Sequence, residues 1–246
     1  MRKSLAALAF LICGTLSTAA AELKVMTVGL VGNSFTKLTA AWSQKTGNTV
    51  TLVLPPSALD MVLDAMKTKG ADAVLLPMSE MPAQAAQFRP GTIRAIGRVL
   101  FGLGVKLNMP APRITSEAAF KAALAGKTVL VNDPATSLNG RMAKAMLNGP
   151  GFETVTVHGI YSAAAELVRG NNGGDYVITV LPEEVNLAGL KLVGEVPPAL
   201  GLKIDFGGGV TTKAAQPELA RQFLDYLTSA EAVAVWRAGG VASPVP

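Results

Sequence analysis

Cysteine and histidine are almost absent from this chain of 246 residues, which holds one of each, Cys13 and His158. The usual zinc sites take three or four His and Cys ligands, so we expect no metal. A Ser/His/Asp triad is excluded unless it uses His158. No second histidine or carboxylate cluster supports a ligand role for His158, which we interpret as a surface or strand-end residue.

Long apolar runs are sparse as well, and the one at the N-terminus belongs to a segment with the three parts of a secretory signal peptide. Arg2 and Lys3 are basic, Leu5 to Leu16 is apolar, and residues 17–21 are small. We expect cleavage after Ala21 and export to the periplasm. Cys13 would be removed with this segment, so the mature chain has no thiol, disulfide or lipid anchor.

No other segment offers the roughly 20 consecutive apolar residues that a membrane helix needs. Half of all residues are nevertheless apolar, enough for a sizeable core in one large domain or two small lobes. Without Arg2 and Lys3 the formal net charge falls from +5 to +3, and the remaining basic residues are scattered singly. Surfaces that bind nucleic acid usually carry clusters of Lys and Arg residues. We expect a globular, monomeric protein that does not bind nucleic acid.

Strand-like and helix-like segments alternate along the chain. Val50–Leu54 and Ala71–Leu76 are short apolar runs, and Leu59–Met66 between them repeats apolar residues at helical spacing. Strands separated by helical segments require crossovers, which predict a mostly parallel sheet covered by helices on both faces. The fold class is therefore α/β.

Two segments are candidates for crossings between two lobes. Ile93–Val105 is a long run of apolar residues and glycine that can leave one sheet and enter another, with the crossing near Leu100–Gly104. Val193–Ile204, rich in proline and glycine, leads back. The predicted division is a signal peptide at 1–21, one lobe at 22–99 and 205–246, and a second lobe at 100–204.

The candidate ligand-binding residues lie on loops and strand ends at one edge of the predicted sheets. Open parallel sheets bind ligands beyond the carboxyl ends of their strands, where helix starts with free N–H groups favour an anion. The candidates are Asn33, Ser34, Ser57, Asn139, Tyr161 and Thr179. The Asn and Ser side chains can equally cap helices. Tyr161 can cover the core, and the Thr179 hydroxyl can bond to backbone.

Arg141 is a further candidate because it lies in the first turn of a predicted helix. The helix dipole disfavours a cation there by about 0.3–1 kcal/mol, so its presence suggests an anionic partner such as a ligand carboxylate. A solvated side chain or a pair with Asp133 is the alternative.

Other polar motifs carry no evident chemistry. Glu183 and Glu184 are adjacent and read most simply as a solvated pair. Gly207–Gly209 do not precede a helix, so they form no phosphate loop and predict a bend or bulge in a strand. With no cofactor motif and no catalytic residue set, we expect a binding protein rather than an enzyme.

The order of several phrases along the chain resembles a known family. They are KTGNTVTL, GADAVLLP, NDPATSLNGRMAKAML, AAAELVRGNNGGDYVI, LKLVGEVPPAL and PELARQFLDYLTSAEAVAVWRAGG. Together they resemble the molybdate-binding-protein-like branch of the type II periplasmic solute-binding proteins over nearly the whole mature chain. The resemblance implies two α/β lobes joined by two crossings, closing on a ligand that is delivered to the permease of an ABC-type transporter.

The sequence departs from that branch in its ligand loops. Molybdate binders of the branch usually present one serine in the first loop and another in the second. Here these loops read Gly29-Leu30-Val31-Gly32 and Pro55-Pro56-Ser57-Ala58, so the first serine is missing and the second is displaced or replaced. Arg141 suits a carboxylate, which a guanidinium binds through both oxygens. The predicted ligand is a small anion, with an organic carboxylate favoured over an oxyanion such as molybdate. Some sequences resembling this branch are aconitate isomerases, so a periplasmic isomerase of a small tricarboxylate is the alternative.

Overall fold

The computed structural model of the chain describes residues 20–55, 58–185 and 187–243. The predicted signal peptide lies outside the described residues except for Ala20 and Ala21, and so do Cys13 and Ser57. No helix in these ranges is both long and apolar enough to cross a bilayer.

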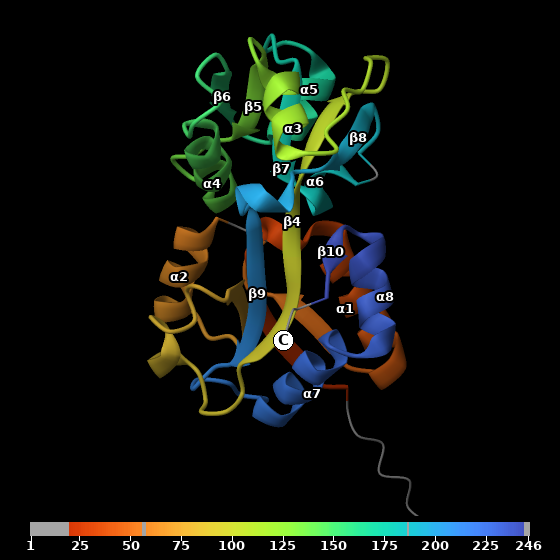
Figure 1. The fold of residues 1–246 in the computed structure, drawn as a ribbon. Coiled ribbons are helices and arrows are strands. Elements are labelled where there is room, and N and C mark those ends of the chain that lie inside the picture. Colours follow the sequence, from red (N-terminus) through yellow and green to blue (C-terminus); the bar gives the residue numbers. More distant parts are fainter. Residues whose placement is uncertain (1–19, 56–57, 186, 244–246) are drawn as a thin grey trace, which may run out of the picture.

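One long strand, β4 (Arg94–Lys106), runs through both lobes of the molecule (Figure 1). Its first half pairs with β9 (Lys203–Val210), from Arg94 opposite Gly208 to Leu100 opposite Lys203. Its second half pairs with β7 (Tyr176–Val180) and β8 (Leu190–Glu195). The long apolar run in the sequence is therefore a single strand that joins two strand sets.

The first lobe contains a parallel set in the order β2-β1-β3, extended by β9. In β3 every residue is buried, since helices cover both faces of the sheet. The elements of this lobe are β1 (Glu22–Thr27), η1 (Gly29–Val31), α1 (Gly32–Thr46), β2 (Thr49–Leu52), α2 (Leu59–Thr68), β3 (Ala73–Pro77), η2 (Ala85–Gln87), α7 (Pro217–Leu227), α8 (Ala230–Ala238) and β10 (Val241–Ala242).

The second lobe contains a parallel set in the order β7-β5-β6, which β7 joins to β4. Helices α4 and α5 contact its strands. Helix α3 belongs to the same lobe, as Figure 1 shows. Its further elements are α3 (Glu117–Leu124), β5 (Thr128–Asn132), α4 (Leu138–Leu147), β6 (Thr156–Ile160), α5 (Ala163–Arg169), α6 (Leu181–Glu184) and η3 (Pro198–Leu200).

The predicted α/β class with two lobes is confirmed, and the parallel pairing is confined to the outer strands. β9 runs antiparallel to both β3 and β4. The reason is the double crossing: β4 leads out of the first lobe and β9 leads back into it, so the two strands run in opposite directions. The division of the lobes at residues 99/100 and 204/205 stays a prediction.

Aromatic side chains tie the C-terminal helices to the first lobe. Phe223 of α7 packs edge-on against Phe35 and Trp42 of α1, with ring centroids 6.1 Å and 5.2 Å apart. Trp236 of α8 packs against Phe206 of β9 at 5.6 Å. Such pairs contribute about 0.5–1.5 kcal/mol each beyond the burial of their area. The last two helices are therefore part of the core of this lobe.

The triple glycine is regular strand and not the predicted bend or bulge. Gly207–Gly209 lie inside β9, and the register irregularity is on the partner strand β4, between Ala95 and Gly97. A Cβ on Gly208 would lie 2.6 Å from Leu224, and one on Gly209 would lie 2.5 Å from Phe88. The missing side chains let α7 and Phe88 pack directly onto the strand.

Candidate functional site

A cleft of about 740 Å³ lies where loops of both lobes meet. Ligand pockets commonly measure roughly 300–1,000 Å³, so it is large enough for a small solute. From the first lobe it is lined by Val28, Gly29, Leu30, Pro55, Ala58, Leu59, Met61 and Pro77. From the second lobe it is lined by Asn132, Asp133, Thr136, Ser137, Leu138, Asn139, Tyr161, Ser162 and Glu183.

The polar centre of the cleft is the carboxylate of Glu183, on α6. Its Oε2 accepts hydrogen bonds from Asn132 Nδ2 and Thr179 Oγ1, both at 2.7 Å. Its Oε1 accepts one from Asn139 Nδ2 at 3.1 Å. The three donors are neutral, so they hold the carboxylate in place without compensating its charge.

The topology explains why these residues meet. Asn132 ends β5 and Thr179 lies near the end of β7, and the carboxyl ends of these two parallel strands share one edge of the sheet. Helix α6 begins directly after β7, which places Glu183 four residues after Thr179, at the same edge of the sheet. Hence two parallel strands and one short helix bring side chains that are 40–51 positions apart in sequence into contact.

Asn132 also supports the neighbouring helix α5. Its Oδ1 accepts a hydrogen bond from the backbone N–H of Ala163 at 2.9 Å, at the start of that helix. Ser162, the residue before α5, makes no capping bond with its side chain and has a left-handed backbone conformation, with φ 54° and ψ 52°. Backbone in this region is uncommon for residues other than glycine and often occurs at functional sites.

The start of α4 is fixed by Ser137 and Gly140. Ser137 Oγ accepts a hydrogen bond from the backbone N–H of Gly140 at 3.3 Å and donates one to Asn139 Oδ1. Ser137 is therefore the cap of this helix, and Asn139 lies inside its first turn. A Cβ on Gly140 would overlap the carbonyl oxygen of Asn132. Glycine at this position is what allows α4 to approach β5 closely enough for Asn139 to reach Glu183.

Glu184 lies behind the cleft and is only 2 % exposed. Within the part of the chain that the structure describes, neither of its carboxyl oxygens has a hydrogen-bond partner. Burial raises the pKa of Glu184 well above its usual range, and the charge of Glu183 adds to the increase. The interpretation of Glu183 and Glu184 as a solvated pair is therefore wrong. The short helix that directly follows a buried strand turns one carboxyl group into the cleft and the other into the interior.

The charged side chains that line the cleft are both acidic. They are Asp133 and Glu183, and no Arg, Lys or His is among the described lining residues. Asp133 is engaged locally, since its Oδ1 accepts a hydrogen bond from the N–H of Ala135 at 3.0 Å. An anion in this cleft would depend on N–H groups at the helix starts and on neutral side chains.

Three of the predicted ligand residues lie at the cleft. Asn139 and Tyr161 line it, Asn139 nearly buried and Tyr161 84 % exposed. Thr179 is buried behind it, and its hydroxyl donates to the Glu183 carboxylate rather than to backbone. Asn132 and Glu183 were not among the predicted ligand residues. A polar residue that ends a buried strand was the available signal for Asn132.

The other candidates are placed differently. Asn33 and Ser34 lie inside α1 and cap nothing there, because the turn at Gly29–Val31 starts the helical segment earlier than expected. Asn33 is exposed, whereas Ser34 is buried against Gly239, and neither lines the cleft. Arg141 is exposed on α4 and does not line it either. Ligand contact by these three residues and by Ser57, which lies outside the described residues, stays a prediction.

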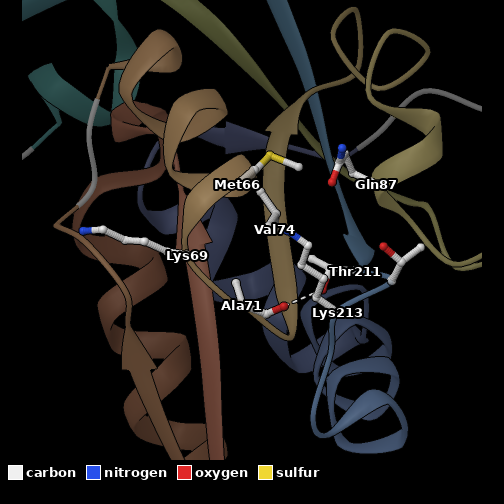
Figure 2. Close-up of a pocket in the computed structure, with 8 residues that line it drawn as sticks. Met66, Lys69, Ala71, Val74, Gln87, Thr211 and Lys213 are labelled. Atoms are coloured by element: carbon white, nitrogen blue, oxygen red, sulfur yellow. Dashed lines mark hydrogen bonds between the residues drawn. The ribbon is translucent and has the colours of Figure 1, made fainter.

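A second pocket lies at the opposite end of β3, lined by Met66, Lys69, Ala71, Val74, Gln87, Thr211, Thr212 and Lys213 (Figure 2). Its volume of about 10 Å³ has room for about one water molecule. The Thr211 hydroxyl donates to the carbonyl oxygen of Ala71 across it. This pocket is too small for a solute. Within the described ranges, no group of three His, Cys, Asp or Glu side chains is arranged to hold a metal ion.

Comparison with known families decides the family of the chain. Residues 23–242 match the model of a family described as bacterial extracellular solute-binding protein. The chain belongs to this family. No curated protein sequence matches it.

Solved structures of binding proteins share the fold of this family member. The substrate-binding domain of a putative molybdenum ABC transporter from Clostridium difficile superposes with a TM-score of 0.73 at 13 % identity, covering 92 % of this chain and 100 % of the other. The periplasmic molybdate-binding protein of Azotobacter vinelandii gives 0.71 at 16 % identity, with 91 % and 100 % covered. PEB3 of Campylobacter jejuni with L-phospholactate bound gives 0.67 at 15 % identity, with 90 % and 100 % covered. At these identities the likeness establishes the fold alone.

Proposed function

We propose that this family member is the solute-binding component of an ABC-type transporter and works in the periplasm. It captures one small molecule in the cleft between its lobes and presents it to a membrane permease. The observation that carries this proposal is the cleft of about 740 Å³, which is lined by loops of both lobes. A solute bound there would contact both strand sets at once.

The structural neighbours support the transport role but leave the ligand open. One is described as part of a putative molybdenum ABC transporter, a second as molybdate-binding, and a third contains L-phospholactate. Different ligands on one fold indicate that loop residues set specificity. The comparisons give no support to the alternative of a tricarboxylate isomerase.

The ligand class predicted from the sequence is a small anion, with an organic carboxylate favoured and an oxyanion such as molybdate as the other choice. An anionic ligand is supported by the positions of α2 and α4, which both begin at the cleft. Leu59 of α2 and Leu138 and Asn139 of α4 line it there. Helix starts attract negative charge. The negative charge of Glu183 would repel a purely anionic ligand. The carboxylate group of a ligand would therefore bind at the helix starts and away from the Glu183 side chain.

A thermal-shift screen of the mature protein tests the proposed function. The probes are molybdate, sulfate, succinate, citrate, cis-aconitate, the L-amino acids and putrescine. A ligand at about 100 times its Kd stabilises a one-site protein by about 2.7 kcal/mol, which raises the melting temperature by several degrees. We expect at least one probe to do this while remaining chemically unchanged. No shift with any probe would count against solute binding, and conversion of cis-aconitate would indicate the isomerase.

A further inference from the structure

Glu183 is a negative charge at the cleft with no positive partner among the described residues. Its hydrogen-bond partners are the amides of Asn132 and Asn139 and the hydroxyl of Thr179. Each ion pair recorded for the described residues lies elsewhere. A partly buried carboxylate is normally paired with a cation, so its partner is expected to come from outside the chain.

The carboxylate is also held ready for such a partner. Oε2 accepts two hydrogen bonds, whereas Oε1 accepts one, so Oε1 retains capacity for a further donor. Asn132 is itself fixed by its bond from the N–H of Ala163, and Asn139 is nearly buried. Side chains that are fixed before binding lose little freedom on binding.

The surroundings favour a cation over a neutral donor. Asp133 is the second charged residue of the lining, and no basic side chain lies among the described lining residues. Glu184, directly behind Glu183, offers no positive charge either. A negatively charged group of a solute would be repelled by Glu183 more strongly in the cleft than in bulk water, because the effective dielectric constant of a protein cleft is lower.

We infer that Glu183 determines the specificity of the cleft by accepting a charged hydrogen bond from a protonated amine of the solute. This inference rests on the proposed function and names the ligand class for it: a small organic cation, or a zwitterion whose ammonium group binds Glu183. A zwitterion also accommodates the predicted carboxylate. A purely anionic solute is disfavoured by the carboxylate.

The competing explanation is that Glu183 only holds α6 against α4 and β5. If the role of Glu183 is only structural, replacing its carboxylate would change the stability of the protein and leave the order of ligand preference unchanged. The test must therefore measure selectivity between amines and anions, and not stability alone.

Isothermal titration of three proteins makes this distinction: the wild type, Glu183→Gln and the control Glu153→Gln. Glu153 is exposed and lies before β6, whereas the cleft lies at the other end of that strand, and a glutamine can still accept the bond from Gly151. The amine probes are the L-amino acids and putrescine, and the anion probes are succinate, citrate and molybdate. We expect an amine probe to bind the wild type and the control equally, and to bind Glu183→Gln about ten- to a hundredfold more weakly.

Glu183→Asp provides a second variant that keeps the charge on a shorter side chain. It should retain more amine affinity than Glu183→Gln, because an ion pair at longer range still attracts the ammonium group. If Glu183→Gln does not fold, the inference is tested by Glu183→Asp alone, which should weaken amine probes and not anion probes.

Three results would overturn the inference. They are an absence of binding by every amine probe, equal affinity of an amine for the wild type and Glu183→Gln, and parallel weakening of amines and anions by either variant. Binding of anions alone would leave the proposed function standing while the inference fails. Binding of no probe at all would remove both.

Discussion

Replacing Gly140 by alanine is expected to lower the melting temperature by several degrees. A methyl group there would overlap the carbonyl oxygen of Asn132, and neither the end of β5 nor the first turn of α4 is a flexible side chain that can move aside. Overpacking of this kind costs about 1–3 kcal/mol or more, which exceeds the gain of at most about 1 kcal/mol from replacing glycine in a helix. In a protein of this size, about 1 kcal/mol corresponds to roughly 2–4 °C.

Gly70→Ala is the matched control for this substitution. Gly70 lies between α2 and β3, has no positive φ, and a Cβ there would meet nothing within 4 Å. Its replacement should leave the melting temperature unchanged or slightly raised. Calorimetry of the two variants checks the prediction. Equal melting temperatures for Gly140→Ala and the wild type would show that the close approach of α4 to β5 is not tight.

Glu184→Gln is expected to change how stability depends on pH. Because burial raises the pKa of Glu184, the folded protein keeps this proton at pH values where the unfolded chain has released it. The stability associated with the neutral carboxyl group is fully present below the unfolded pKa of about 4.3. It is lost as the pH rises from there through the raised folded pKa, by up to about 1.4 kcal/mol per pH unit. A glutamine stays neutral throughout, so the variant should not show this loss.

Urea unfolding at intervals from pH 5 to pH 8 measures this difference. The gap between Glu184→Gln and the wild type should grow with pH in favour of the variant. The control Glu153→Gln should follow the wild type, since the pKa of Glu153 is lowered and this group stays ionised over that range in both states. Parallel curves for Glu184→Gln and the wild type would contradict a raised pKa in the folded protein.

Most of the secondary structure is visible in the sequence because apolar spacing is a local property. The run Ile93–Val105 predicted a crossing, and it forms the strand β4 that joins the lobes. Helix ends are less visible. The last helix is capped by Ser229, which accepts a bond from Ala232, although Thr228 and Glu231 have the spacing of a capping box. Neighbouring hydroxyl residues compete as caps, and packing decides between them.

The centre of the cleft is not visible in the sequence for a different reason. Asn132 and Glu183 are 51 positions apart, and they meet because β5 pairs with β7, which no local pattern specifies. Glu184 is buried because α6 starts without a loop after β7, whereas adjacent glutamates usually lie in solvent. In contrast, Tyr161 directly follows β6, and Asn139 lies in the first turn of the helix that comes after β5. The rule that ligands bind beyond strand ends therefore predicted both residues at the cleft, where the structure has them.

Hydrogen exchange of the backbone with and without a stabilising probe from the thermal-shift screen tests the central claim most directly. Solute capture between the lobes predicts slower exchange in two groups of segments at once, 28–30 with 58–61 in the first lobe and 132–139 with 161–162 in the second. Exchange in α7, which does not line the cleft, should stay unchanged. Slower exchange in the segments of one lobe only, or in neither group while the probe is bound, would contradict binding in the cleft.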